Sequence, residues 1–132
     1  MNEYMNLQKI IDMLLDLEGP SRAVDDNIAE ALGWSKRFAT ISDTSSDRSR
    51  TVQQNMWLVP SGDVREVPHY TKGAQEARML LQEAAPGVPC ALVIEGGSAR
   101  AQLEGSLPFQ AKNSAIALCL SAITYMKENS SP

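Results

Sequence analysis

The sequence contains few of the residues from which metal or thiol chemistry is built. It has one histidine and two cysteines among 132 residues, and Cys90 and Cys119 lie far apart in the chain among apolar neighbours. Zinc sites group several Cys and His ligands at close spacings, so no metal site is expected. Both cysteines are expected to be buried free thiols, because free cysteine behaves as a small hydrophobe.

Long apolar runs, a leader segment and a phosphate-binding glycine loop are also missing. No run approaches the ~18 apolar residues of a membrane span, and the first six residues do not place a basic region before an apolar one. The spacing Gly-x-x-x-x-Gly-Lys does not occur. The sequence therefore predicts a cytoplasmic protein with no membrane partner and no cofactor.

The net charge of −4 is unevenly distributed along the chain. Acidic residues predominate in residues 1–35, whereas residues 36–50 are net positive and contain Lys36, Arg37, Arg48 and Arg50. Nucleic-acid binders usually present a dominant basic face, because phosphate contacts supply most of the affinity. Binding of nucleic acid through these four residues is therefore one functional hypothesis, and the acidic character of the rest of the chain disfavours it.

Four amphipathic helices are predicted from apolar residues that recur every three or four positions. The first helix carries the stripe Leu7, Ile10, Ile11, Leu14 and Leu15. Ser21 is expected to cap a second helix that ends at Gly33, because serine and glycine favour these two ends. Thr71 is expected to cap the third, and the fourth spans residues 110 to about 127.

Residues 90–103 carry the clearest strand signal, because two alternating runs meet at Gly96 and Gly97. A type I′ turn at this pair predicts a hairpin with one apolar face. That face comprises Cys90, Leu92, Ile94, Ala99, Ala101 and Leu103. A shift of one residue would mix apolar and polar positions, so the pattern also predicts the register. We expect the apolar face to pack on the fourth helix, at Ile116, Leu120 and Ile123.

The rest of the chain completes the expected architecture. Residues 42–50 are polar without an apolar period and are expected to form a mobile loop, and a short strand is predicted at residues 56–59. The order of elements indicates an α+β fold, with a small antiparallel sheet of three to four strands and helices packed on both faces. We expect one domain over residues 1–132, with an ordered body from 7 to 127.

Several short words of the sequence together resemble one known family. They are Ala31-Leu32-Gly33-Trp34, Val67-Pro68-His69-Tyr70-Thr71, the alanine-rich stretch 73–77, the Gly96-Gly97 hairpin and the stretch 114–123. The family is the phage α/β/α-sandwich domain of small bacteriophage and prophage proteins. The resemblance implies a helix–sheet–helix sandwich and a phage or prophage origin. It implies no reaction, catalytic residue or cofactor.

Candidate binding residues are those that offer more than ordinary solvated surface. Aromatic rings supply large contact areas, a helix N-terminus attracts anions, and arginine is enriched at anion and partner sites. The candidates are Trp34, Trp57, His69, Tyr70, Thr71 and Arg100. We expect a groove without a metal, bordered by one tryptophan and by the His69-Tyr70-Thr71 word, with the hairpin face at Arg100 and Gln102 as the alternative place.

Two further hypotheses on function follow from these residues. The first is a non-enzymatic accessory protein of a phage or prophage that binds a host protein or a small ligand, because no catalytic constellation is evident. The second is a small metal-independent enzyme in which His69 acts as general base together with Tyr70.

Overall fold

The structure, a computed structural model, describes residues 3–43 and 50–129 and the side chains of 7–37 and 56–129. The elements are α1 (Glu3–Asp16), α2 (Arg22–Ala31), β1 (Ser35–Asp43), β2 (Arg50–Leu58), α3 (Ala74–Ala84), β3 (Cys90–Glu95), β4 (Ser98–Leu103), β5 (Phe109–Ala111) and α4 (Ser114–Glu128). The fold is α+β with antiparallel sheets, as the order of elements predicted.

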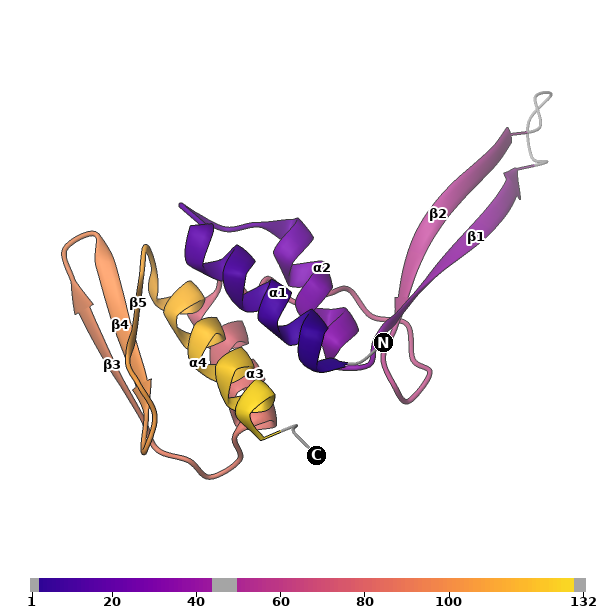
Figure 1. Cartoon of the computed structure of the whole chain (residues 1–132). Coiled ribbons are helices and arrows are strands. Elements are labelled where there is room, and N and C mark those ends of the chain that lie inside the picture. Colours follow the sequence, from indigo (N-terminus) through magenta and orange to yellow (C-terminus); the bar gives the residue numbers. More distant parts are fainter. Residues whose placement is uncertain (1–2, 44–49, 130–132) are drawn as a thin grey trace.

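Helix α4 lies at the centre of the body, between the sheet β3–β4–β5 and the helices α1 and α2 (Figure 1). Every residue of its segment 115–123 is buried. A helix that is apolar on all sides needs neighbours on all sides, and α4 has α3, α1 and the sheet around it. The described helices lie on one side of this sheet (Figure 1), and the outer face carries exposed Arg100 and Gln102.

The β3–β4 hairpin has the register that the alternating pattern predicted, from Cys90 opposite Leu103 to Glu95 opposite Ser98. Gly96 has a φ of 54°, and Gly97 is not among the glycines with positive φ, as in a type II′ rather than a type I′ turn. Ala99, Ala101 and Leu103 of β4 are buried among residues of α4 that include Ile116, Leu120 and Ile123.

On β3, the expectation of a covered apolar face is wrong. Leu92 is 37% exposed and Ile94 is 67% exposed, and Cys90 is exposed rather than buried. The physical reason is position, because β3 is an edge strand and α4 packs mainly beneath β4 and β5. The alternating pattern therefore identified the apolar face of the hairpin correctly, but only the β4 half of that face is buried.

A second hairpin, residues 35–58, projects from the body and is called the arm here (Figure 1). Its strands β1 and β2 have nine residues each and pair with each other, and Leu58 at the end of β2 also forms an isolated bridge with Val64. The sequence predicted only residues 56–59 as strand and 42–50 as loop, yet Ser42, Asp43 and Arg50 belong to paired strands. Residues 44–49 lie outside the described residues. The arm lacks the alternating apolar pattern that a half-buried strand shows.

The predicted helix faces are buried with few exceptions, whereas the predicted helix ends are only partly correct. Ser21 caps α2 by accepting a hydrogen bond from the Val24 amide, and Gly33 follows it with a φ of 97°. Thr71 does not cap α3, which has Gly73 at that position. The fourth helix begins at Ser114, because residues 109–111 form β5 instead. In α1, Leu15 is exposed although the predicted stripe includes it.

Candidate functional site

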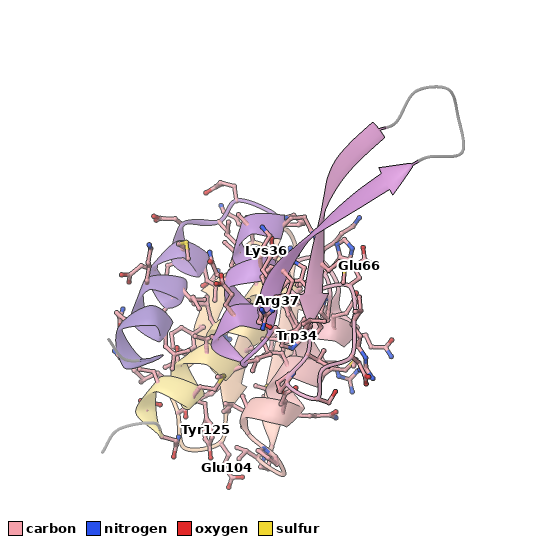
Figure 2. All side chains as sticks on the ribbon, turned by 90° about the vertical axis from the view of Figure 1, so that its right-hand side faces the viewer. Trp34, Lys36, Arg37, Glu66, Glu104 and Tyr125 are labelled. Carbon is pink, nitrogen blue, oxygen red and sulfur yellow. The ribbon has the colours of Figure 1, made fainter. Side chains whose placement is uncertain are left out.

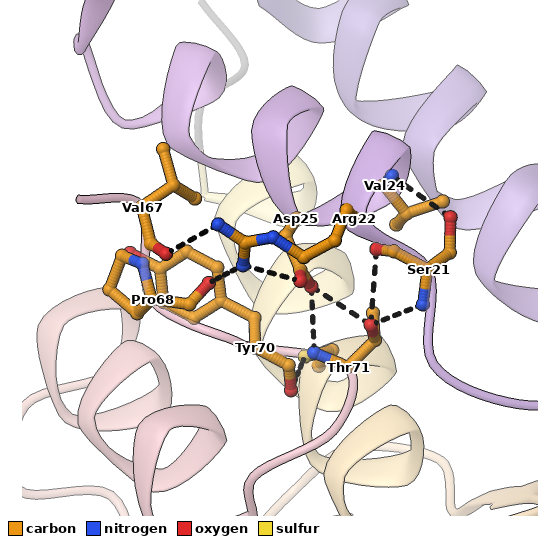
Figure 3. Close-up of polar contacts among 9 residues, drawn as sticks. Ser21, Arg22, Val24, Asp25, Val67, Pro68, Tyr70 and Thr71 are labelled. Atoms are coloured by element: carbon orange, nitrogen blue, oxygen red, sulfur yellow. Dashed lines mark hydrogen bonds and ion pairs between the residues drawn. The ribbon is translucent and has the colours of Figure 1, made fainter. Parts of the chain in front are cut away.

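Residues 67–71, called the junction here, connect α2 to α4 through a buried polar network (Figure 3). The Thr71 amide and hydroxyl both donate to Oδ1 of Asp25, each at 2.9 Å. Arg22 forms an ion pair with Asp25 at 2.9 Å. Asp25 is 1% exposed, and a buried carboxylate is tolerated because its charge is paired and its lone pairs accept hydrogen bonds.

Further bonds fix the backbone of the junction on both sides. The Arg22 guanidinium donates to the carbonyls of Val67 at 2.9 Å and Pro68 at 3.2 Å. On the α4 side, the Cys119 thiol donates to the Tyr70 carbonyl at 3.3 Å. The junction is therefore part of the packed body and holds α2 and α4 in a fixed relation.

The junction buries two of the three residues that were candidates for ligand binding. Tyr70 is 5% exposed and Thr71 is 0% exposed, so they offer almost no surface to a ligand. Burial raises the pKa of the Tyr70 phenol, and the nearby Glu83, Cys119 and Asp25 raise it further. Tyr70 therefore stays protonated and neutral at physiological pH.

His69 is half-buried. Among the described residues, its imidazole has no hydrogen bond to Tyr70, to a carboxylate or to a hydroxyl. An activated nucleophile or a positioned base needs such a partner. Within the described residues, the structure therefore shows no side chain that orients the His69 imidazole.

The two tryptophans lie at the base of the arm and are half-buried against the core. Figure 2 shows Trp34 close to Lys36 and Arg37 at this base. The Lys36 ammonium lies 5.8 Å from the centroid of the Trp57 ring, within the range of a cation–π contact. Trp34 borders a cavity of about 300 Å³ between α1 and α2. No junction residue lines this cavity.

Arg100 is exposed on the outer face of β4, where its partner positions are Val93 of β3 and Gln110 of β5. The sheet and the arm lie at opposite ends of the body (Figure 1). The structure therefore does not bring the six candidate residues into one site. It places them in three separate surroundings: the junction, the base of the arm and the outer face of the sheet.

A groove of about 470 Å³ between α3 and β3 was not predicted from the sequence. Its lining includes Arg78, Leu81, Gln82, Val88, Cys90 and Leu92. Its volume lies within the ~300–1,000 Å³ typical of ligand pockets. Burial raises the pKa of the Cys90 thiol. The sequence contains no signal for this groove, because it forms between two elements whose relative position no local pattern specifies.

The groove lies beside an unpaired strand edge. In a two-residue hairpin, the pair Glu95–Ser98 exchanges hydrogen bonds and every second pair does the same. The bond from the Glu104 amide to the Pro89 carbonyl, 2.9 Å long, continues the same alternation at the other end of the hairpin. The amides and carbonyls of Cys90, Leu92 and Ile94 therefore point away from β4. We call this unpaired side of β3 the open edge.

The opposite edge of the same sheet is protected. Strand β5 has three residues, and its register with β4 directs the backbone of Phe109 and Ala111 inward, so that only Gln110 faces outward. Pro108 precedes the strand, and Lys112 follows it in an ion pair with Glu18 at 3.8 Å. Proline, lysine and short length are the usual protections of an edge strand. The open edge is likewise preceded by a proline, Pro89, but it is six residues long and has neither proline nor charge from Cys90 to Ile94.

Comparisons with known proteins found no family model, no curated protein and no solved structure that matches the chain. No helix in the described part of the chain combines the length and the apolar character that a membrane span requires. Within residues 3–43 and 50–129, no three His, Cys, Asp or Glu side chains are grouped so that they could hold a metal ion.

Proposed function

We propose that this chain is a non-enzymatic accessory protein of phage or prophage origin that acts by binding a partner protein at the open edge of β3. The origin rests on the sequence resemblance alone. The binding role rests on one observation, an uncharged and unpaired strand from Cys90 to Ile94 beside a groove. Exposed apolar edges pair readily with other chains, so natural proteins usually protect them unless they use them.

The surroundings of His69 support binding over catalysis. The alternative of a small enzyme needs His69 to exchange a proton with Tyr70 or with a substrate nearby. Tyr70 is buried and has a raised pKa, and its neighbour His69 has no partner that would orient it among the described residues. The groove offers apolar walls and unpaired backbone groups, which are features of recognition.

The arm supports a second candidate, the binding of nucleic acid. A two-stranded ribbon fits the major groove of B-DNA, and Lys36 and Arg37 are exposed at the base of the arm (Figure 2). The predominance of acidic residues in α1 and α2 opposes it, because like charge repels phosphate. The open edge is therefore the stronger basis for a function.

Two proline variants of the same sheet test the binding role. Ile94→Pro removes an outward amide from the open edge without removing a bond to β4, and Gln110→Pro does the same at the protected edge. Each tagged variant is used to capture proteins from a bacterial lysate treated with nuclease, and quantitative mass spectrometry compares the amounts. We expect Ile94→Pro to reduce specific capture about tenfold or more, a loss of ~1.4 kcal/mol, and Gln110→Pro to retain it.

Circular dichroism must show that both variants are folded. Equal capture by wild type and folded Ile94→Pro would contradict the proposal. A third variant, Lys36→Gln with Arg37→Gln, changes only the base of the arm. If this variant alone loses its partners, and does so only when nuclease is omitted, the function belongs to the arm and to nucleic acid.

A further inference from the structure

We infer that the occupant of the open edge is an extended peptide segment of the partner that adds a strand to β3, inserts alternate apolar side chains into the α3–β3 groove and places a carboxylate against Arg78. This inference rests on the proposed function and names the partner's chemistry. It follows from the backbone, the side chains and the charge of the same surface.

The backbone of the open edge has the form of a strand template. Cys90, Leu92 and Ile94 each present one amide donor and one carbonyl acceptor outward, at the two-residue spacing of an antiparallel or parallel ladder. These groups have no partner strand in the described chain. An added segment would satisfy them with main-chain hydrogen bonds, which supply affinity independently of sequence.

The side chains beside the open edge supply selectivity. Leu92 and Cys90 line the groove together with Leu81 of α3. A strand added to β3 continues the pleat, so every second side chain of the segment lies on the same face as Leu92. Those side chains meet the apolar walls of the groove, and the intervening ones face solvent. The surface therefore selects segments with alternating apolar residues.

The charge of the groove indicates a third feature of the partner segment, a carboxylate. Among the described residues, Arg78 has no ion pair, as is also true of Arg65 and Arg100. Arg78 also lines the groove, one turn before Gln82 on the same face of α3. A guanidinium binds a carboxylate through two parallel hydrogen bonds. A segment with an acidic side chain or a terminal carboxylate complements this position.

The same charge argument disfavours a second copy of this chain as the occupant. Antiparallel pairing of two β3 edges would place Cys90, Leu92 and Ile94 of the other copy on the groove face. Glu95, the one carboxylate of β3, belongs to the alternate set with Ala91 and Val93, which faces away from the groove. Arg78 would then gain no partner from the added strand. The peptide segment of another protein is the occupant that satisfies the backbone, the groove and the cation together.

A displayed library of random seven-residue segments tests the inference on the full-length protein. We expect segments with alternating apolar residues and one acidic residue to be enriched on wild type, and the acidic preference to disappear on Arg78→Gln. The most enriched segment is then synthesised with aspartate or lysine at the acidic position, and as a free acid or an amide. Fluorescence anisotropy should show about tenfold weaker binding of the lysine peptide to wild type and no difference for Arg78→Gln.

N-methylation of the peptide separates strand addition from simple filling of the groove. Methyl groups on the alternate amides that face β3 should abolish binding, whereas methyl groups on the other set should leave it nearly unchanged. The thiol of Cys90 provides an independent readout, since it is the exposed cysteine and lines the groove. Bound peptide should slow its reaction with a thiol reagent several-fold.

Three results would overturn the inference. They are enrichment without an acidic preference, equal effects of the two N-methylated sets, and a wild-type dimer that Ile94→Pro converts to monomer in analytical ultracentrifugation. The last result would assign the open edge to a second copy. If no segment is enriched while Ile94→Pro still loses captured proteins, the binding role stands and the extended segment is wrong. If capture is also unchanged, both proposals are wrong.

Discussion

The two hairpins of this protein are built by the same local chemistry but differ in what supports them. In β3–β4, one face of β4 is fully buried against α4, with Ala101 and Leu103 in the core. In the arm, β1 and β2 pair over nine residues and project from the body (Figure 1). A two-stranded hairpin without a packed face is only marginally stable in water.

The difference shows what determines a register. In β3–β4, a slip of one residue would expose the apolar set and bury Arg100, so packing selects one pairing. In the arm, the base packs on the body through Trp57, and cross-strand pairing holds the strands beyond it. We therefore expect the free energy of unfolding to depend strongly on α4 and the sheet and weakly on the arm.

The largest effect is expected where α4 supports the sheet. Leu120 is fully buried in the core, so Leu120→Ala leaves a cavity and should lower the free energy of unfolding by about 2–5 kcal/mol. Urea denaturation measures this loss. The control is Leu15→Ala on exposed α1 surface, which should change stability by less than about 0.5 kcal/mol. A loss below about 1 kcal/mol for Leu120→Ala would mean that α4 does not support the sheet.

An alkaline loss of stability is the next largest expected effect. Burial raises the pKa of Cys119 above its ordinary value of 9.0 and that of Tyr70 above 10.0. As the pH rises, the unfolded chain therefore loses these protons before the folded chain does. The free energy of unfolding has its full value below about pH 9 and falls above it, by up to ~1.4 kcal/mol per pH unit for each group. Urea denaturation at successive pH values measures this slope.

Two variants assign the alkaline slope to its groups. Cys119→Ala should remove the part that begins near pH 9, and Tyr70→Phe the part that begins near pH 10. A protein without most of the arm should keep the wild-type slope, because both groups lie in the body. An unchanged slope in Cys119→Ala and in Tyr70→Phe would show that neither group causes the effect.

The smallest effect is expected for the arm itself. Replacing residues 40–53 with Asn-Gly closes the pair Ala39–Gln54 with a two-residue turn. Because the described strand residues 40–43 and 50–53 pair with each other, we expect the melting temperature to change by less than about 3 °C. Differential scanning calorimetry measures it. A fall of 10 °C would show that the arm stabilises the body, and the contrast between the hairpins would disappear.

Local patterns were sufficient for several elements of this fold. The alternation in residues 90–103 predicted the register of β3–β4 pair by pair, because one strand of the hairpin has a buried face. Ser21 and Gly33 predicted the two ends of α2, because a capping hydroxyl and a positive φ are properties of single residues.

Functional surfaces were less accessible to sequence reasoning. Tyr70 and Thr71 resemble ligand-binding residues in the sequence, but tertiary contacts with Asp25 and Cys119 place them in the body. Arg78 is one charged residue on an amphipathic helix, and nothing local shows that its neighbours across the groove belong to β3.

By itself, the sequence determined the presence of the four helices and the register of the β3–β4 hairpin, because capping and side-chain periodicity are local, but it did not give the start of α4. Only the tertiary structure decided that β3 is left at the open edge while β5 is protected. An alternating pattern reports that a strand has an apolar face, but burial of that face and pairing of its edge depend on neighbours that are distant in the chain.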